Sequence, residues 1–132
     1  MILSQKLLLR NMTLVVAFCS LITSHASATV HIVNVGNFSF TPAKTHIEHG
    51  DTVRWVWSSG FHNSTSDAGS PKAWASPTLS GSGQSFQVAF SAADGNGPFP
   101  YACTIHFTTM KDTIFVTSLG VEVSEQSNKG PL

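Results

Sequence analysis

Hydrophobic and polar residues alternate along much of the chain from residue 29 onward, and the 3.6-residue period of a helix is nearly absent. Runs rich in Val, Ile, Phe, Trp and Thr are separated by clusters of Gly, Pro, Asn and Ser, which is typical of short strands joined by turns. The clearest alternation places Val53, Trp55 and Trp57 on one face. We expect extended segments at 29–35, 38–48 with a break at Pro42, 52–57, 84–90, 99–103 and 111–118.

This pattern predicts an all-β fold. Seven or eight short strands with turns at this spacing indicate a β-sandwich or a barrel. The stretch 66–83 is rich in Ser, Gly and Pro, so we expect irregular structure there, with room for a small helix and with Trp74 and Leu79 as anchors. Residues 94–98 read as a turn. Three residues of the 84–90 segment are expected to face the core: Phe86, Val88 and Phe90.

The N-terminus has the three parts of a secretory signal peptide. A basic segment precedes an apolar run, 14–22, and the small-residue cleavage pattern Ala26-Ser-Ala28 follows. The run is shorter than the roughly 20 apolar residues that span a bilayer. We therefore expect residues 1–28 to be a signal peptide, with an uncleaved membrane anchor or a lipoprotein modified at Cys19 as the alternatives.

The remaining chain, 29–132, then forms one domain with a frayed tail from about residue 124. Five basic and seven acidic side chains give this part a net charge of −2, and only 11% of the full sequence is charged. Nothing in that balance points to nucleic acid or to an anionic membrane surface as a partner. We expect a monomer without stable membrane insertion.

Three metal-binding side chains lie within eight residues of one another: Cys103, His106 and Met110. Without residues 1–28, Cys103 is the only cysteine and Met110 the only methionine. An unpaired thiol in an exported protein is reactive, intermolecular or bound to something. Thiolate, imidazole and thioether together select copper, whereas zinc usually takes Cys and His sets without methionine.

A trigonal copper-thiolate site needs a second histidine. His31 lies in the first expected strand, and His46 and His49 flank a turn, where histidines are more often plain surface residues. A second metal site at His46 and His49 is disfavoured because the two point to opposite faces of a strand. His62 follows a strand in a polar loop, 58–65, where a scaffold can present it, but its position alone leaves the choice open.

Several motifs in order along the chain resemble the small type 1 copper proteins, the cupredoxins of the plastocyanin, pseudoazurin and amicyanin group. Gly50-Asp-Thr-Val-Arg-Trp55 is similar to the family's G-D-T-V-x-W strand, and Phe61-His-Asn63 to its first histidine loop. The other matching motifs are Ser85-Phe-Gln-Val-Ala-Phe90 and Tyr101-Ala-Cys-Thr-Ile-His106. The resemblance covers most of the chain after residue 28, and it implies a cupredoxin-like Greek-key β-sandwich.

The resemblance also implies the ligands of one type 1 copper: His62, Cys103 and His106 in the equatorial plane and Met110 as the axial ligand. Only three residues separate His106 from Met110, a loop length between those of plastocyanin and amicyanin, so the axial contact is where the chain departs from the family. By the same resemblance, Asn63 and Thr104 hold the ligand loops by hydrogen bonding. An apolar docking patch around the exposed edge of His106 is expected to include Gly60, Phe61, Pro98, Phe99 and Phe107.

These features predict an electron-transfer protein that passes single electrons between transient redox partners. A copper oxidase or nitrite reductase would need His-x-His pairs and further domains, and the sequence has neither, so we expect no enzyme. The alternative is an exported module for copper delivery or storage. Asn37 and Asn63 each begin an N-glycosylation sequon, and a glycan on Asn63 would crowd the metal site. We therefore expect the periplasm, with secretion as the alternative.

Overall fold

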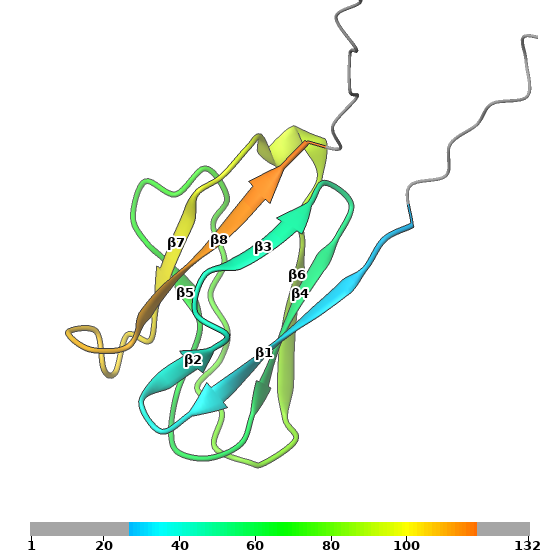
Figure 1. The fold of residues 1–132 in the computed structure, drawn as a ribbon. Helices are drawn as coiled ribbons and strands as arrows, with labels where there is room; N and C mark the ends of the chain where they lie inside the picture. Colours follow the sequence, from blue (N-terminus) through cyan, green and yellow to red (C-terminus); the bar gives the residue numbers. More distant parts are fainter. Residues whose placement is uncertain (1–26, 119–132) are drawn as a thin grey trace, which may run out of the picture.

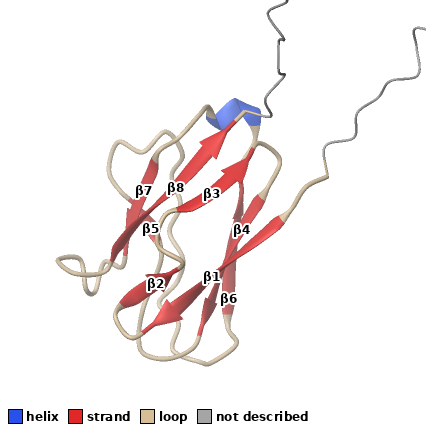
Figure 2. Cartoon of the chain, in the orientation of Figure 1, coloured by secondary structure: helices blue, strands red, loops and turns tan. Residues whose placement is uncertain are grey.

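The computed structural model describes residues 27–118. The expected signal peptide falls almost entirely, and the expected tail wholly, outside the described residues. Figure 2 shows strands joined by loops, with one short helix. None of the helical structure within 27–118 is long or apolar enough to cross a bilayer.

Within residues 27–118, eight strands form two four-stranded sheets that pack face to face (Figure 1). Sheet A has the order β2-β1-β4-β6 and sheet B the order β3-β8-β7-β5. The two-sheet arrangement confirms the predicted all-β sandwich. The strands are β1 (Val30–Gly36), β2 (Ser39–Thr41), β3 (Thr45–Glu48), β4 (Thr52–Trp57), β5 (Thr65–Ser66), β6 (Ser85–Ala89), β7 (Phe99–Ala102) and β8 (Lys111–Thr117).

The core lies between the sheets and follows the period of two. In β4 the residues Val53, Trp55 and Trp57 are buried, as their alternation predicts. β1 runs parallel to β4 in a register that sets Val33 beside Trp55. Across the sandwich, the Trp55 ring meets Tyr101 of β7 edge to face, with centroids 5.4 Å apart. The strands that lead to the metal-binding loops are therefore held by large, interlocked side chains.

One expectation about local structure was wrong. The segment 38–48 is two strands in different sheets: β2 pairs with β1 in sheet A, whereas β3 pairs with β8 in sheet B. Pro42 cannot continue a ladder, and Lys44 has a φ of +61°, so the chain leaves one sheet and enters the other. The expected turn at 94–98 is preceded by a 3-10 helix, Ala92–Asp94. Apart from Ser66, which ends β5, residues 66–83 are irregular and contain no helix, and Trp74 is buried and Leu79 packs against the core, as expected.

The fold brings several chain segments to one end of the sandwich (Figure 1). The turn between β1 and β2, the loop after β4 and the loop between β7 and β8 all lie there. The first and second of these loops leave sheet A, and the third leaves sheet B. Side chains far apart in the sequence can therefore meet at this end.

Candidate metal centre

The loop that carries Cys103, His106 and Met110 is closed by its own backbone. The Cys103 amide donates to the Met110 carbonyl (3.0 Å), and the Met110 amide donates to the His106 carbonyl (2.9 Å). The His106 amide in turn donates to the Cys103 carbonyl (3.2 Å). These bonds form successive tight turns, which keep Cys103, His106 and Met110 close together in space.

The backbone of His62 is held by hydrogen bonds to Leu79 and to Trp57. Its amide and carbonyl exchange hydrogen bonds with Leu79 (3.1 and 3.0 Å), and its carbonyl also accepts from the Trp57 indole Nε1 (3.1 Å). The side chain is only 2% exposed. The loop therefore presents a buried imidazole in one place, although a loop histidine is ordinarily a surface residue.

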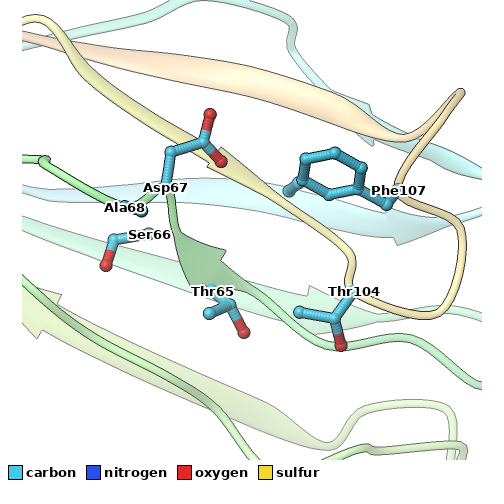
Figure 3. A pocket seen from close by; sticks show the side chains of 7 residues that line it. Thr65, Ser66, Asp67, Ala68, Thr104 and Phe107 are labelled. Carbon is cyan, nitrogen blue, oxygen red and sulfur yellow. The ribbon is translucent and has the colours of Figure 1, made fainter.

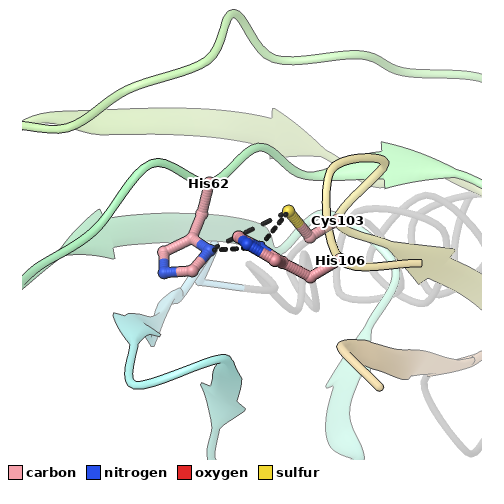
Figure 4. A group of neighbouring side chains, drawn as sticks. All are labelled: His62, Cys103 and His106. Atoms are coloured by element: carbon pink, nitrogen blue, oxygen red, sulfur yellow. Dashed lines mark hydrogen bonds between the residues drawn. The ribbon is translucent and has the colours of Figure 1, made fainter. Parts of the chain in front are cut away.

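Three donor atoms from the two loops face one another (Figure 4). The Nδ1 atoms of His62 and His106 are 3.1 Å apart, and the Cys103 Sγ lies 3.9 and 3.6 Å from them, respectively. A circle through three points at these separations has a radius of about 2.1 Å, close to the length of a metal bond to imidazole nitrogen. The donor set therefore fits a single metal ion. Within residues 27–118 it is the one cluster of three or more His, Cys, Asp or Glu donors.

The electrostatics of the site favour metal binding to His62. Burial lowers the pKa of His62, and the neighbouring imidazole of His106 lowers it further. Only the neutral imidazole has a free lone pair for a metal. Protons therefore compete less with a metal at His62 than they would at an exposed histidine.

The loops that carry His62 and Cys103 are joined by a pair of reciprocal hydrogen bonds. The Asn63 Nδ2 donates to the Thr104 Oγ1 (2.7 Å), and the Thr104 amide donates to the Asn63 Oδ1 (2.8 Å). Asn63 is 8% exposed and Thr104 is exposed, so the two bonds are partly buried. This contact confirms the expectation that Asn63 and Thr104 hold the ligand loops together.

Met110, the last residue of this loop before β8, is buried. Its side chain is 1% exposed and belongs to the same core cluster as Cys103. A thioether there is shielded from water and is the kind of weak, soft donor that an axial copper position takes.

The other described histidines have partners elsewhere. His31 pairs with Asp51 (2.7 Å), and the His46 ring stacks on Phe115 with centroids 4.9 Å apart. His49 Nε2 bonds the Asn96 side chain (2.8 Å). The second metal site considered at His46 and His49 therefore does not form.

A hollow of about 440 Å³ opens beside the two imidazoles. Its exposed apolar side chains are Phe38 (62% exposed), Phe61 (67%) and Ile105 (49%), and Gly60 lines it as well. Gly60 and Phe61 were expected in this patch. Phe38 and Ile105 were missed. Their positions pointed to exposure, because Phe38 lies in the tight turn between β1 and β2 and Ile105 lies between Cys103 and His106.

Two residues of the expected patch were wrong, and a third lies outside this hollow. Phe99 is completely buried, because β7 turns it into the core. Pro98 precedes β7, whose other end leads to Cys103, so it lies away from the metal-binding end. Phe107 is exposed, but its ring lies against the Lys111 ammonium (3.9 Å to the centroid) rather than in the hollow beside His106.

Phe107 instead borders a second hollow, of about 360 Å³, beside the ligand loop (Figure 3). Its walls come from β5 and the residues that follow, from the end of β7, and from Thr104. The one ionisable side chain in its lining is Asp67, and none of the four expected ligands reaches it. This hollow is therefore separate from the metal centre.

Comparison with known proteins agrees with this geometry. A family model described as copper binding proteins, plastocyanin/azurin family, matches residues 27–117. An oxidized amicyanin mutant is 24% identical (TM-score 0.57, covering 71% of this chain and 87% of that one), and a reduced amicyanin mutant is 22% identical (0.59, 71% and 88%). A Cu-containing nitrite reductase from Thermus scotoductus SA-01 is 26% identical (0.57), but the match covers 70% of this chain and only 23% of that one. No curated protein matches the sequence significantly.

The chain belongs to the copper-binding plastocyanin/azurin family, the small type 1 cupredoxins, which confirms the resemblance and the cupredoxin-like fold. Copper is its cofactor, and in general terms it is a copper-binding electron-transfer protein.

Gly60 offers a direct test of how His62 is placed. Its φ is +74°, and a Cβ there would lie 2.6 Å from the His62 Nε2. We expect Gly60→Ala to lose about 1–2 kcal/mol of stability from the left-handed backbone and, in addition, to displace the imidazole and weaken Cu(II) binding at least tenfold. Urea unfolding and copper titration measure the two effects.

Gly69→Ala is the matched control, because Gly69 has a φ of +84° and open space around its Cβ position. It should lose similar stability and keep full copper affinity. Equal copper affinity in both variants would contradict the placement of His62 by this contact.

Proposed function

We propose that His62, Cys103 and His106 are the equatorial ligands of one copper ion, that Met110 is its weak axial ligand, and that the chain is an exported carrier of single electrons. The observation that carries this proposal is the convergence of three donor atoms, all within 4.8 Å of one another, from loops of opposite sheets. When bound, copper supplies the one-electron Cu(II)/Cu(I) couple.

The protein's own contribution is to keep the ligands still. Thiolate and imidazole suit Cu(II), and thioether suits Cu(I), so one set of positions can serve both oxidation states. The Asn63 and Thr104 bonds and the Leu79 pairing hold the two loops on a sandwich packed with Trp and Tyr rings. Little movement on electron transfer means a small reorganisation cost, which favours a carrier over an enzyme.

His106 is the proposed exit for the electron. Its side chain is partly exposed beside the hollow, whereas His62 and Cys103 are buried. No Asp, Glu, Lys or Arg lines that hollow within the described part of the chain. We therefore assign it as a docking surface for brief, apolar contact with redox partners, small in area and weak in affinity.

Export is proposed from residues 1–28, with the periplasm as the destination. The Asn63 sequon supports a compartment without N-glycosylation, because the Nδ2 atom that would carry a glycan already donates to the Thr104 Oγ1 (2.7 Å) in a partly buried contact beside the proposed metal site.

The copper assignment is tested by loading the purified chain with Cu(II). An intense visible band near ~600 nm, lost on reduction and regained on oxidation, is expected from the copper-thiolate bond. Cys103→Ser should abolish the band, and His46→Ala, which alters a histidine outside the cluster, should retain it. Colourless binding of Cu(I) alone by the parent protein would favour copper delivery instead.

The docking surface is tested by electron self-exchange between Cu(I) and Cu(II) copies, followed by NMR line broadening. Phe61→Ser should slow exchange about tenfold, the effect of losing one interface contact of about 1.4 kcal/mol. Ile32→Ser is the control, because Ile32 is also exposed (44%) but lies on β1 away from the hollow. Equal slowing of self-exchange in the two variants would contradict the assignment of this hollow as the docking surface.

Export is tested by expressing the full chain in a bacterium and weighing the periplasmic product by mass spectrometry. The product should begin at Thr29. Replacing a cleavage-site residue, Ala28→Phe, should leave the longer precursor at the membrane. A full-length product in the cytoplasm from the parent gene would refute export.

A further inference from the structure

We propose that Phe38 is a positioning residue of the copper centre, whose ring braces the His62 and His106 imidazoles from the turn between β1 and β2. The inference rests on the ligand set proposed above. Nothing in the sequence pattern marks Phe38 as part of the site.

The backbone at Phe38 is unfavourable for a phenylalanine. β1 and β2 are joined by two residues, Asn37 and Phe38, with Gly36 paired to Ser39 across the turn. Both central residues have positive φ, +49° and +56°. A hairpin turn of this kind favours Asn at its first position and Gly at its second, because a side chain in the left-handed region is strained. Asn37 follows the rule, and Phe38 breaks it.

Core packing does not explain the exception, because the Phe38 side chain is 62% exposed. The ring instead stands nearly perpendicular to both proposed ligand imidazoles. Its centroid is 4.8 Å from that of His106 (89° between planes) and 5.8 Å from that of His62 (83°). Strained backbone that persists without a packing benefit is characteristic of functional sites.

The protein's own groups, among the described residues, give the His106 ring little hydrogen-bonding support. A metal-bound imidazole generally donates its other ring N–H to a carboxylate, carbonyl or water, which fixes the ring. Among residues 27–118, the hydrogen-bonding distances of the His106 ring all involve Nδ1, toward His62 and Cys103, and no protein group bonds its Nε2. The orientation of the ring is therefore left to packing, and Phe38 supplies an aromatic contact perpendicular to it.

The ring should also set the polarity around the metal. A Cu(II)-thiolate pair carries one net positive charge and a Cu(I)-thiolate pair carries none, so an apolar cover that keeps water away favours the reduced form. The apolar shell of a metal site tunes its potential in this way. Removing the ring should lower the reduction potential and loosen the geometry of His106.

Phe38→Gly is the decisive variant, because glycine removes the ring and relieves the strain together. We expect the metal-free variant to melt at the same temperature as the parent or higher. We expect the copper-loaded variant to show a lower reduction potential, and a visible band and paramagnetic resonance spectrum altered from those of the parent. Phe38→Tyr keeps the ring and should restore the parent's potential and spectra.

Lys44→Gly is the matched control for strain, since Lys44 has a φ of +61° and is an exposed residue between β2 and β3. It should leave the potential and spectra unchanged. A parent-like potential and spectra in Phe38→Gly, with only self-exchange slowed, would make Phe38 a docking contact and overturn the proposal. A large fall in its melting temperature would make the ring a structural support and overturn it too. Absence of the visible band in the parent itself would instead refute the ligand set.

Discussion

The reciprocal hydrogen bonds between Asn63 and Thr104 are the contact on which the metal centre depends. One residue lies beside His62 and the other beside Cys103, so the pair fixes the distance between two loops that belong to opposite sheets. Both bonds are partly buried, and together they use a donor and an acceptor of each residue, which sets direction as well as separation. Without this contact, the two loops would be held separately, His62 by its bonds to Leu79 and Trp57, and Cys103 by the turns of its own loop.

The rest of the sandwich supports that contact by being difficult to deform. Trp55, Trp74 and Tyr101 pack together between the sheets, with ring centroids 5.4 to 5.9 Å apart. Interiors packed at this density resist small displacements. Strands β4 and β7 leave the core only a few residues before His62 and Cys103, so the rigidity of the core reaches the ligands. An electron carrier benefits because its ligands need to move little when the metal changes charge.

Local stability is given up at the same end of the molecule. Gly60 adopts a left-handed conformation and leaves no room for a Cβ against His62, and Phe38 accepts a conformation better suited to glycine. Apolar rings are exposed around the hollow, where a protein selected only for stability would place polar groups. These features share one location and one consequence, an apolar and accessible surface beside the proposed copper site.

Local pattern was sufficient for much of this structure. The alternation at 52–57 predicted the buried face of β4, and the close spacing of Cys103, His106 and Met110 predicted a soft metal-binding loop, because both depend on residues near one another in the chain. His62 needed the family resemblance, since a loop histidine has no local mark. Phe99 was misplaced because exposure depends on which way a strand faces.

The amino-acid sequence by itself thus determined most of the strands, the copper-binding chemistry and the loop that carries Cys103, since these follow from short-range periodicity and donor type. Tertiary structure alone decided that 38–48 divides between the sheets and that Phe38 reaches the imidazoles of His62 and His106. The physical reason for the position of Phe38 is that β1 lies parallel to β4, so both strands finish at the same end of the sandwich. No local pattern encodes that pairing.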